Sequence, residues 1–200
     1  MSDGESRDRL RRRTLSHSYK ALVAPCESPF RAPTIIHSVN ATQETGPEFS
    51  LPGTEGEGTQ KYSLNEYTEE GGVVLIFYPF DFSPVCTDVI CHFRDAEFLS
   101  FTDNVDVFGV SLDSCYAHMR FIEEYDIPFP LLSDTTVTVT ERYGLAYDEW
   151  EHHEGVPKRA LLTIDETRSI RYKWLTENAY ESPSYDELHQ TVLSLEDRSR

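Results

Sequence analysis

The sequence predicts an α/β layered fold, with a central mixed sheet and helices on both faces. Three observations support this prediction. The chain has 200 residues, of which 38% are hydrophobic, enough for one compact domain and a modest appendage. Residues 73–78 (VVLIFY) are continuously β-branched and aromatic, as in a strand covered on both faces. From residue 46 onward, short apolar runs alternate with segments of helical period, which is typical of strand–helix–strand units.

The first elements of this region are short. Residues 48–51 (EFSL) predict a strand that ends in a Pro-Gly turn at 52–53, and the Gly- and Glu-rich residues up to Gly58 predict a loop. Residues 62–64 then lead into a polar segment that ends at residue 72.

The core strand at 73–78 is followed by a proline-bounded turn at 79–84. Beyond it Val89 and Phe93 recur at helical spacing, so we expect a helix over residues 85–100.

The second half of the chain continues the alternation. Residues 105–110 (VDVFGV) predict the next strand. The helix expected over residues 114–125 has its apolar residues on one side: Met119, Phe121, Ile122 and Tyr125. The remaining elements, in order, are a short strand beginning within 128–132, a brief helix within 135–143 stopped by Gly144, strands at 160–164 and 169–175 around a turn, and a closing helix at 185–195.

Charge and hydropathy exclude several classes of protein. No apolar run approaches the roughly 20 residues that cross a bilayer. The formal charge at pH 7 is −17, so most of the surface would repel DNA or an anionic membrane, and we expect neither nucleic acid nor a membrane as a partner. Because such a charge repels itself unless salt screens it, the composition also predicts an acidic surface of halophilic type.

Residues 1–45 differ from the rest of the chain. They are rich in Arg, Ser and Pro without a sustained apolar period, and residues 1–38 carry a net charge of +3. We expect a basic, disordered arm, followed by a folded domain over residues 46–200. The arm is either a tail that contacts a polyanion or an upstream stretch that belongs to no folded unit. No apolar stretch follows its positive cluster, so we expect a cytoplasmic protein.

The chemistry is predicted in the turn after the strand at 73–78. Cys86 would enter the first turn of the next helix, where unpaired backbone N–H groups and the helix dipole favour the thiolate over the thiol. Pro79 and Pro84 would rigidify the loop. Ser83 supplies a hydroxyl that can hydrogen-bond the sulfur or an arriving oxygen atom.

A second cysteine, Cys91, follows Cys86 in the same predicted helix. Five residues of helix turn the chain by about 140° and advance it by about 7.5 Å, which places the two Cα atoms roughly 8–9 Å apart. A disulfide needs less than about 7 Å, so the pair can bond only if the helix unwinds. Two interpretations remain open on spacing alone: a redox pair that alternates between an intact and a melted helix, or two small buried residues.

The run FYPFDFSPVCTDVICHFRD resembles the signature of the peroxiredoxins, and most resembles the peroxiredoxin Q or bacterioferritin-comigratory-protein branch. The resemblance continues through FGVSLDSCYAHMRFIEEYDIPFPLLSD and VPKRALLTID, and covers about residues 46–195. It implies a thioredoxin-like fold and thiol-dependent reduction of hydrogen peroxide and organic hydroperoxides.

The resemblance also implies a role for each matching residue. Cys86 is similar to the peroxidatic nucleophile and Cys91 to the resolving thiol. Pro79 would shield the site and Ser83 would bind the peroxide oxygens. Arg159 would stabilise the thiolate and the charge on the leaving oxygen, a role that suits a guanidinium because it stays charged and donates from a fixed fork. Taken alone, Arg159 reads as a surface charge at a strand end.

The sequence departs from the family pattern at three places. Ser83 stands where Thr is commoner, which keeps the hydroxyl but removes a methyl that would fix its rotamer. Val89 stands where this branch often has Glu, which removes a carboxylate from the site. The arm at 1–45 has no counterpart in the family.

Other candidate residues have simpler interpretations. His92, His118, His152 and His153 do not show the spacing of a metal site, and the tandem pair lies in an acidic stretch that predicts a solvated loop. Cys115 reads as a small buried residue, and Cys26 lies in the arm with no partner that the sequence names.

The sequence therefore predicts a cytoplasmic two-cysteine peroxidase that needs no metal, flavin or haem. A peroxide is the expected substrate, a thioredoxin- or glutaredoxin-like protein is the expected reductant, and both a monomer and a homodimer are compatible with the sequence. Two alternatives stand beside this prediction. One is a one-cysteine peroxidase in which Cys91 is structural, and the other is a non-catalytic thioredoxin-fold thiol sensor or metallochaperone.

Overall fold

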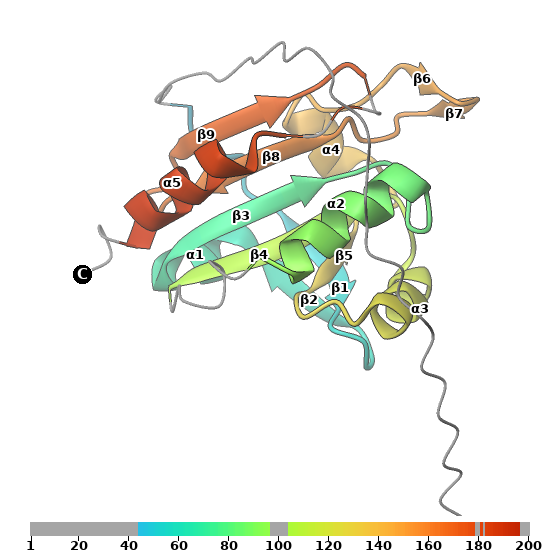
Figure 1. Ribbon diagram of the computed structural model, residues 1–200, viewed down its shortest axis with the longest axis horizontal. Coiled ribbons are helices and arrows are strands. Elements are labelled where there is room, and N and C mark those ends of the chain that lie inside the picture. Colours follow the sequence, from blue (N-terminus) through green and yellow to red (C-terminus); the bar gives the residue numbers. More distant parts are fainter. Residues whose placement is uncertain (1–43, 97–103, 179–180, 182, 197–200) are drawn as a thin grey trace, which may run out of the picture. The chain divides into compact units, whose positions relative to one another are not determined.

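The computed structural model describes residues 44–96, 104–178, 181 and 183–196, and shows a seven-stranded mixed sheet (Figure 1). Across the sheet the strands are β2 (Gln60–Ser63), β1 (Ser50–Thr54), β5 (Leu131–Ser133), β4 (Val105–Ser111), β3 (Gly72–Phe77), β8 (Ala160–Ile164) and β9 (Ile170–Leu175). The predicted arm, with Cys26, lies outside the described residues except for its last two positions.

Strand β3 lies at the centre of the packing because both of its faces are covered. It pairs in parallel with β4 and antiparallel with β8. Val74 and Ile76 point into one apolar cluster, whereas Val73 and Leu75 point into another on the opposite face, as the period of two in a strand requires. A sequence that is apolar at every position of β3 follows from this double burial.

Helices cover both faces, as the sequence predicts (Figure 1). The helices are α1 (Leu64–Glu70), α2 (Pro84–Arg94), α3 (Cys115–Tyr125), α4 (Thr138–Arg142) and α5 (Tyr185–Glu196). Apolar residues of α2, α3 and α5 join the cluster around Val74, and residues of α1 and α4 join the cluster around Val73. The predicted α/β layered fold is therefore confirmed. No helix among the described residues is both long and apolar enough to cross a membrane.

The predicted turn at 52–53 is wrong, because these residues lie inside β1. Pro52 is paired with Lys61 and Gly53 with Gln60 of β2. A Cβ atom at Gly53 would approach a side-chain carbon of Leu132 to 2.5 Å. Glycine at this position thus permits β1 to pack closely against Leu132. A Pro-Gly pair is typical of a turn, but here the glycine marks a tight contact inside a strand.

The predicted helix over 85–100 ends too late. Helix α2 ends at Arg94, and the Asp95 backbone N–H caps it by donating to the carbonyl of Cys91. The Arg94 guanidinium also donates to the Tyr125 carbonyl and to the Asp95 carboxylate, which fixes the end of the helix.

Helix α3 begins where the sequence predicts, with the Ser114 side chain accepting from the Ala117 backbone N–H. Its buried face differs from the predicted one, however. The helix buries Cys115, His118, Phe121 and Ile122, whereas Met119 and Tyr125 are only partly buried. A polar residue thus occupies a central core position of α3, and the apolar pattern alone did not predict it.

A small hairpin replaces part of the predicted loop between α4 and β8. It pairs β6 (Glu149–Trp150) with β7 (His153–Glu154). Trp150 and His153 both pack against the ring of Phe80 in the β3–α2 loop, with centroids 6.1 and 4.9 Å away. These contacts order an otherwise exposed acidic segment.

Candidate active site

Cys86 lies in the first turn of α2, as the sequence predicts. Pro84 is the first residue of the helix and Ser83 is its N-cap in an extended conformation. The Ser83 carbonyl accepts the Thr87 backbone N–H at 2.9 Å, while the Ser83 side chain makes no capping hydrogen bond. The hydroxyl is therefore not consumed by the helix, and the N-terminal N–H groups near Cys86 favour a negative charge on its sulfur.

Arg159 reaches this sulfur from the other side of the fold. The residue directly precedes β8, whose Ala160 is paired with Phe77 at the end of β3. Arg159 Nη2 donates to Cys86 Sγ at 3.4 Å, and Nη1 donates to the Val85 carbonyl at 3.1 Å. The structure thus brings together two residues 73 positions apart that the sequence placed at one site.

Both members of this contact are buried. Cys86 is 0% exposed and Arg159 is 3% exposed. A guanidinium in such surroundings interacts strongly with a thiolate, because little water screens the pair. Arg159 Nε is also buried and has no hydrogen-bond partner among the described residues. Arg159 thus has one buried donor that the described residues leave unpaired.

The other two predicted residues, Pro79 and Ser83, lie in the β3–α2 loop that precedes Cys86. Pro79 is buried and Ser83 is half-buried. Between them Phe82 has a φ of 60°, in the left-handed region that bulky residues seldom adopt. Its ring packs edge to face on Phe121 of α3, with the centroids 5.1 Å apart. The contact with α3 holds the loop in this conformation.

Cys91 lies in the same uninterrupted helix as Cys86 and is half-buried. Both cysteines are in the reduced thiol form, with no disulfide between them. The intact helix therefore keeps the two cysteines in the separated arrangement that the spacing predicts. Next to Cys91, the His92 ring stacks on Tyr185 of α5, with centroids 3.4 Å apart.

Tyr147 was missed by the sequence analysis. Burial raises the pKa of its phenol, the charges of Glu177 and Cys86 raise this pKa further, and Arg159 opposes the shift. The phenol thus lies within electrostatic range of both site residues. It donates to the Glu177 carbonyl at 3.1 Å.

Cys115 and the histidines fall outside this arrangement. Cys115 is buried as predicted, and burial raises the pKa of its thiol. His152 and His153 lie on the exposed hairpin. The part of the chain that the structure describes holds no group of three or more His, Cys, Asp or Glu residues placed to bind a metal.

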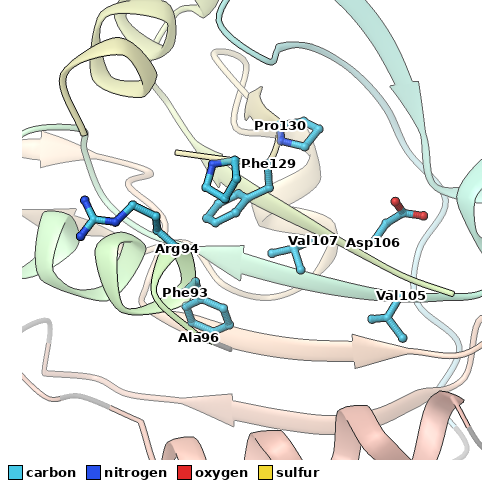
Figure 2. A pocket seen from close by; sticks show the side chains of 9 residues that line it. Phe93, Arg94, Ala96, Val105, Asp106, Val107, Phe129 and Pro130 are labelled. Carbon is cyan, nitrogen blue, oxygen red and sulfur yellow. The ribbon is translucent and has the colours of Figure 1, made fainter. Parts of the chain in front are cut away.

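A cavity of about 280 Å³ lies at the far end of α2 from Cys86 (Figure 2). The charged residues Arg94 and Asp106 line it together with Phe93, Ala96, Val105, Val107, Pro128, Phe129 and Pro130. None of the predicted site residues lines it, so this cavity is separate from the Cys86–Arg159 site.

Three comparisons with known proteins agree with this geometry. The chain matches the AhpC/TSA family over residues 42–173. It is 38% identical over 134 residues to the peroxiredoxin bcp of Coxiella burnetii, covering 66% of this chain and 85% of that protein. It is 33% identical over 157 residues to the chloroplastic peroxiredoxin Q of Sedum lineare, covering 78% and 80%.

The fold also resembles that of a solved structure, peroxidoxin BcpB from Mycobacterium tuberculosis. The TM-score is 0.65 at 27% sequence identity, over 78% of this chain and 99% of the other. This similarity confirms the predicted thioredoxin-like fold.

Proposed function

The chain belongs to the AhpC/TSA family and is a peroxiredoxin of the Q or bacterioferritin-comigratory-protein branch, a thiol-dependent peroxidase, and on this premise we propose that Cys86 is its peroxidatic nucleophile. The observation that carries the proposal is the buried contact of Arg159 Nη2 with Cys86 Sγ at 3.4 Å. A cation, a helix N-terminus and a free thiol meet at one point, which is the arrangement that activates a cysteine.

In the first step the Cys86 thiolate attacks one oxygen of the peroxide. A sulfur–oxygen bond forms while the O–O bond breaks, and the second oxygen takes up a proton and leaves as water or an alcohol. Sulfur is oxidised to a sulfenic acid. Arg159 stabilises the thiolate and the charge that develops on the leaving oxygen, and its unpartnered Nε–H is a further donor for a peroxide oxygen.

The loop residues complete the peroxide site in this proposal. The Ser83 hydroxyl, which does not cap α2, hydrogen-bonds the arriving oxygens. Pro79 is buried and lacks an N–H, so it excludes water without competing for the peroxide. Hydrogen peroxide and organic hydroperoxides are both proposed as substrates.

In the second step Cys91 resolves the sulfenic acid. Its sulfur bonds to Cys86 Sγ, the sulfur–oxygen bond breaks, and water leaves. Because the intact helix separates the two thiols, α2 unwinds from its first turns through Cys91 and His92 before this disulfide forms. A thioredoxin- or glutaredoxin-like dithiol then reduces the disulfide by exchange and is itself oxidised.

Intact mass after one equivalent of hydrogen peroxide, with mapping of the cysteines, tests this sequence of steps on the reduced full-length chain. We expect a loss of about two hydrogens, localised to Cys86 and Cys91. Cys86→Ser should abolish the reaction, and Cys115→Ser, which removes a buried cysteine outside the site, should leave it unchanged. Slow oxidation spread over all the cysteines would contradict an activated Cys86.

Cys91→Ser separates the proposed route from a one-cysteine route. In the proposed route this variant accumulates sulfenic acid at Cys86, trapped by dimedone, and loses turnover with a thioredoxin-like reductant. Full turnover of Cys91→Ser with that reductant would show that Cys91 is structural.

A further inference from the structure

A cluster of buried polar side chains supports the loop that precedes Cys86, and the chemistry proposed above does not use it. At its centre His118 Nδ1 lies 2.8 Å from Asp81 Oδ2, and the two side chains are 0% and 1% exposed. His118 belongs to α3, and Asp81 to the β3–α2 loop between Pro79 and Ser83. The contact therefore joins the active-site loop to a helix that supplies none of the reacting groups.

The hydrogen bonds around the pair account for each of its polar atoms. His118 Nε2 lies 3.3 Å from the Leu132 carbonyl oxygen, which can only accept, so this contact is a hydrogen bond in the tautomer that carries a hydrogen on Nε2. A single hydrogen bond joins Nδ1 and Asp81 Oδ2. The Tyr78 hydroxyl donates to the remaining carboxyl oxygen at 2.8 Å. All four polar atoms of the two side chains are thus satisfied.

The backbone of Asp81 is held as firmly as its side chain. Its N–H donates to Asp113 Oδ2 at 2.8 Å, and the Ser111 hydroxyl donates to the same oxygen at 2.9 Å. Burial raises the pKa of Asp113, the neighbouring Asp81 charge raises it further, and these donors and His118 oppose the shift. Contacts from Tyr78, which directly follows β3, from α3 and from the segment after β4 therefore converge on one residue of the loop.

Apolar side chains could fill the space that this pair occupies. The other residues of α3 buried on this face are Cys115, Phe121 and Ile122, and an apolar residue at position 118 would bury as well. Replacing a buried charged pair by apolar residues is often neutral or stabilising, whereas removing one partner is costly. What the pair supplies is a defined position for Asp81, and hence for its neighbours in the loop.

We propose that His118 is a positioning residue for the peroxidase reaction, which through Asp81 holds Pro79 and Ser83 in place beside Cys86. This proposal rests on the proposed function of Cys86. His118 affects the approach and orientation of the peroxide, whereas the reactivity of the thiolate itself depends on Arg159 and the helix N-terminus. The two effects can be separated because an alkylating agent needs the thiolate and access to it, but none of the groups that bind and orient a peroxide.

The test compares the rate of Cys86 oxidation by hydrogen peroxide with its rate of alkylation by iodoacetamide, in the full chain carrying Cys91→Ser and Cys115→Ser. We expect His118→Leu to lower the peroxide rate about 10- to 100-fold while the alkylation rate changes less than about threefold. His118→Gln keeps a donor toward Asp81, so we expect a smaller fall in the ratio of the peroxide oxidation rate to the alkylation rate. This variant carries the test if the leucine variant does not fold.

Asp81→Asn is the conservative variant that should preserve the geometry. The Asn oxygen can accept from Tyr78, and its NH₂ can donate to Nδ1 of a neutral His118 whose Nε2–H still meets Leu132. We expect its rate ratio to stay within about threefold of the parent protein. A loss as large as that of His118→Leu would overturn a geometric role for the pair.

Asp165→Asn is the matched control for loss of a buried carboxylate. Asp165 is 0% exposed, accepts from Thr167 and Ser169, and lies at the opposite end of β8 from Arg159. It should destabilise the fold without changing the rate ratio. Equal falls of both rates in His118→Leu, or no fall in either, would overturn the proposal, while a parent protein that fails to react with peroxide would contradict the proposed function instead.

Discussion

The two cysteines of α2 lie in contrasting surroundings although only five residues separate them. Cys86 is fully buried, and Arg159, the helix N-terminus and the tethered loop all surround it. Cys91 is half-buried, and near it the His92 ring stacks on Tyr185 while Arg94 donates to the Tyr125 carbonyl. One end of the helix is thus built around a sulfur, and contacts with α5 and with the end of α3 hold the other end.

The difference shows how one helix can serve two steps. Oxidation needs fixed groups around Cys86, because stabilisation of developing charge depends on preorganised donors. Resolution needs the same helix to open, and the contacts at its Cys91 end oppose that opening. Substitutions at the two ends should therefore change different rates.

The largest effect is expected at the Cys86 end. Arg159→Ala removes the guanidinium from the sulfur and from the leaving oxygen, and should lower the rate of oxidation by hydrogen peroxide about 100- to 1000-fold. Stopped-flow measurement on the reduced protein checks this. The rate of resolution, measured after the sulfenic acid has formed, should change far less.

Arg171→Ala is the control for this substitution. Arg171 lies on β9 and pairs with Asp165, away from Cys86. Its oxidation rate should match that of the parent protein. Similar losses in both arginine variants would mean that the effect of Arg159 is a general one on the fold.

The sequence predicted the two members of the Cys86–Arg159 contact unequally, for a physical reason. Cys86 was predicted from local order alone, since a buried strand, a proline-bounded turn and a helix start are all encoded within a few residues. Arg159 is 73 residues from Cys86, and only the resemblance to a family connected them before the register of β3 and β8 placed them together.

His118 shows what apolar periodicity misses. The predicted face of α3 centred on Met119, whereas the helix buries His118, whose partner Asp81 lies 37 residues earlier. A core histidine is stable only with its hydrogen-bond partners, and these come from other elements of the fold. The same limit explains Gly53, where a tight strand contact has the sequence pattern of a turn.

A smaller effect of opposite sign is expected at the Cys91 end. Tyr185→Ala removes the ring on which His92 stacks and should make α2 easier to unwind. An aromatic contact contributes about 1 kcal/mol, which corresponds to an approximately fivefold faster resolution. Quenched-flow mass analysis of the sulfenic acid and the disulfide measures this rate, and oxidation of Cys86 should be unchanged.

Tyr116→Ala is the matched control, because Tyr116 is 77% exposed on α3. Slower resolution in Tyr185→Ala, with Tyr116→Ala normal, would show that the ring promotes the open state and would reverse the interpretation of the stack.

The smallest effect concerns pH at the same end of the helix. Burial lowers the pKa of His92 from its ordinary value of 6.5, and the Asp95 charge opposes this in part. Protons therefore bind more readily to His92 when α2 is open. The closed helix has its full stability from this group above pH 6.5 and loses it as the pH falls, so acid favours opening. Between pH 7.5 and 5.5 the resolution rate of the parent protein, divided by that of His92→Gln, should rise by up to about threefold. A ratio that stays constant over this range would show that His92 remains equally buried when the disulfide forms, which would restrict the unwinding of α2 to the turns before Cys91.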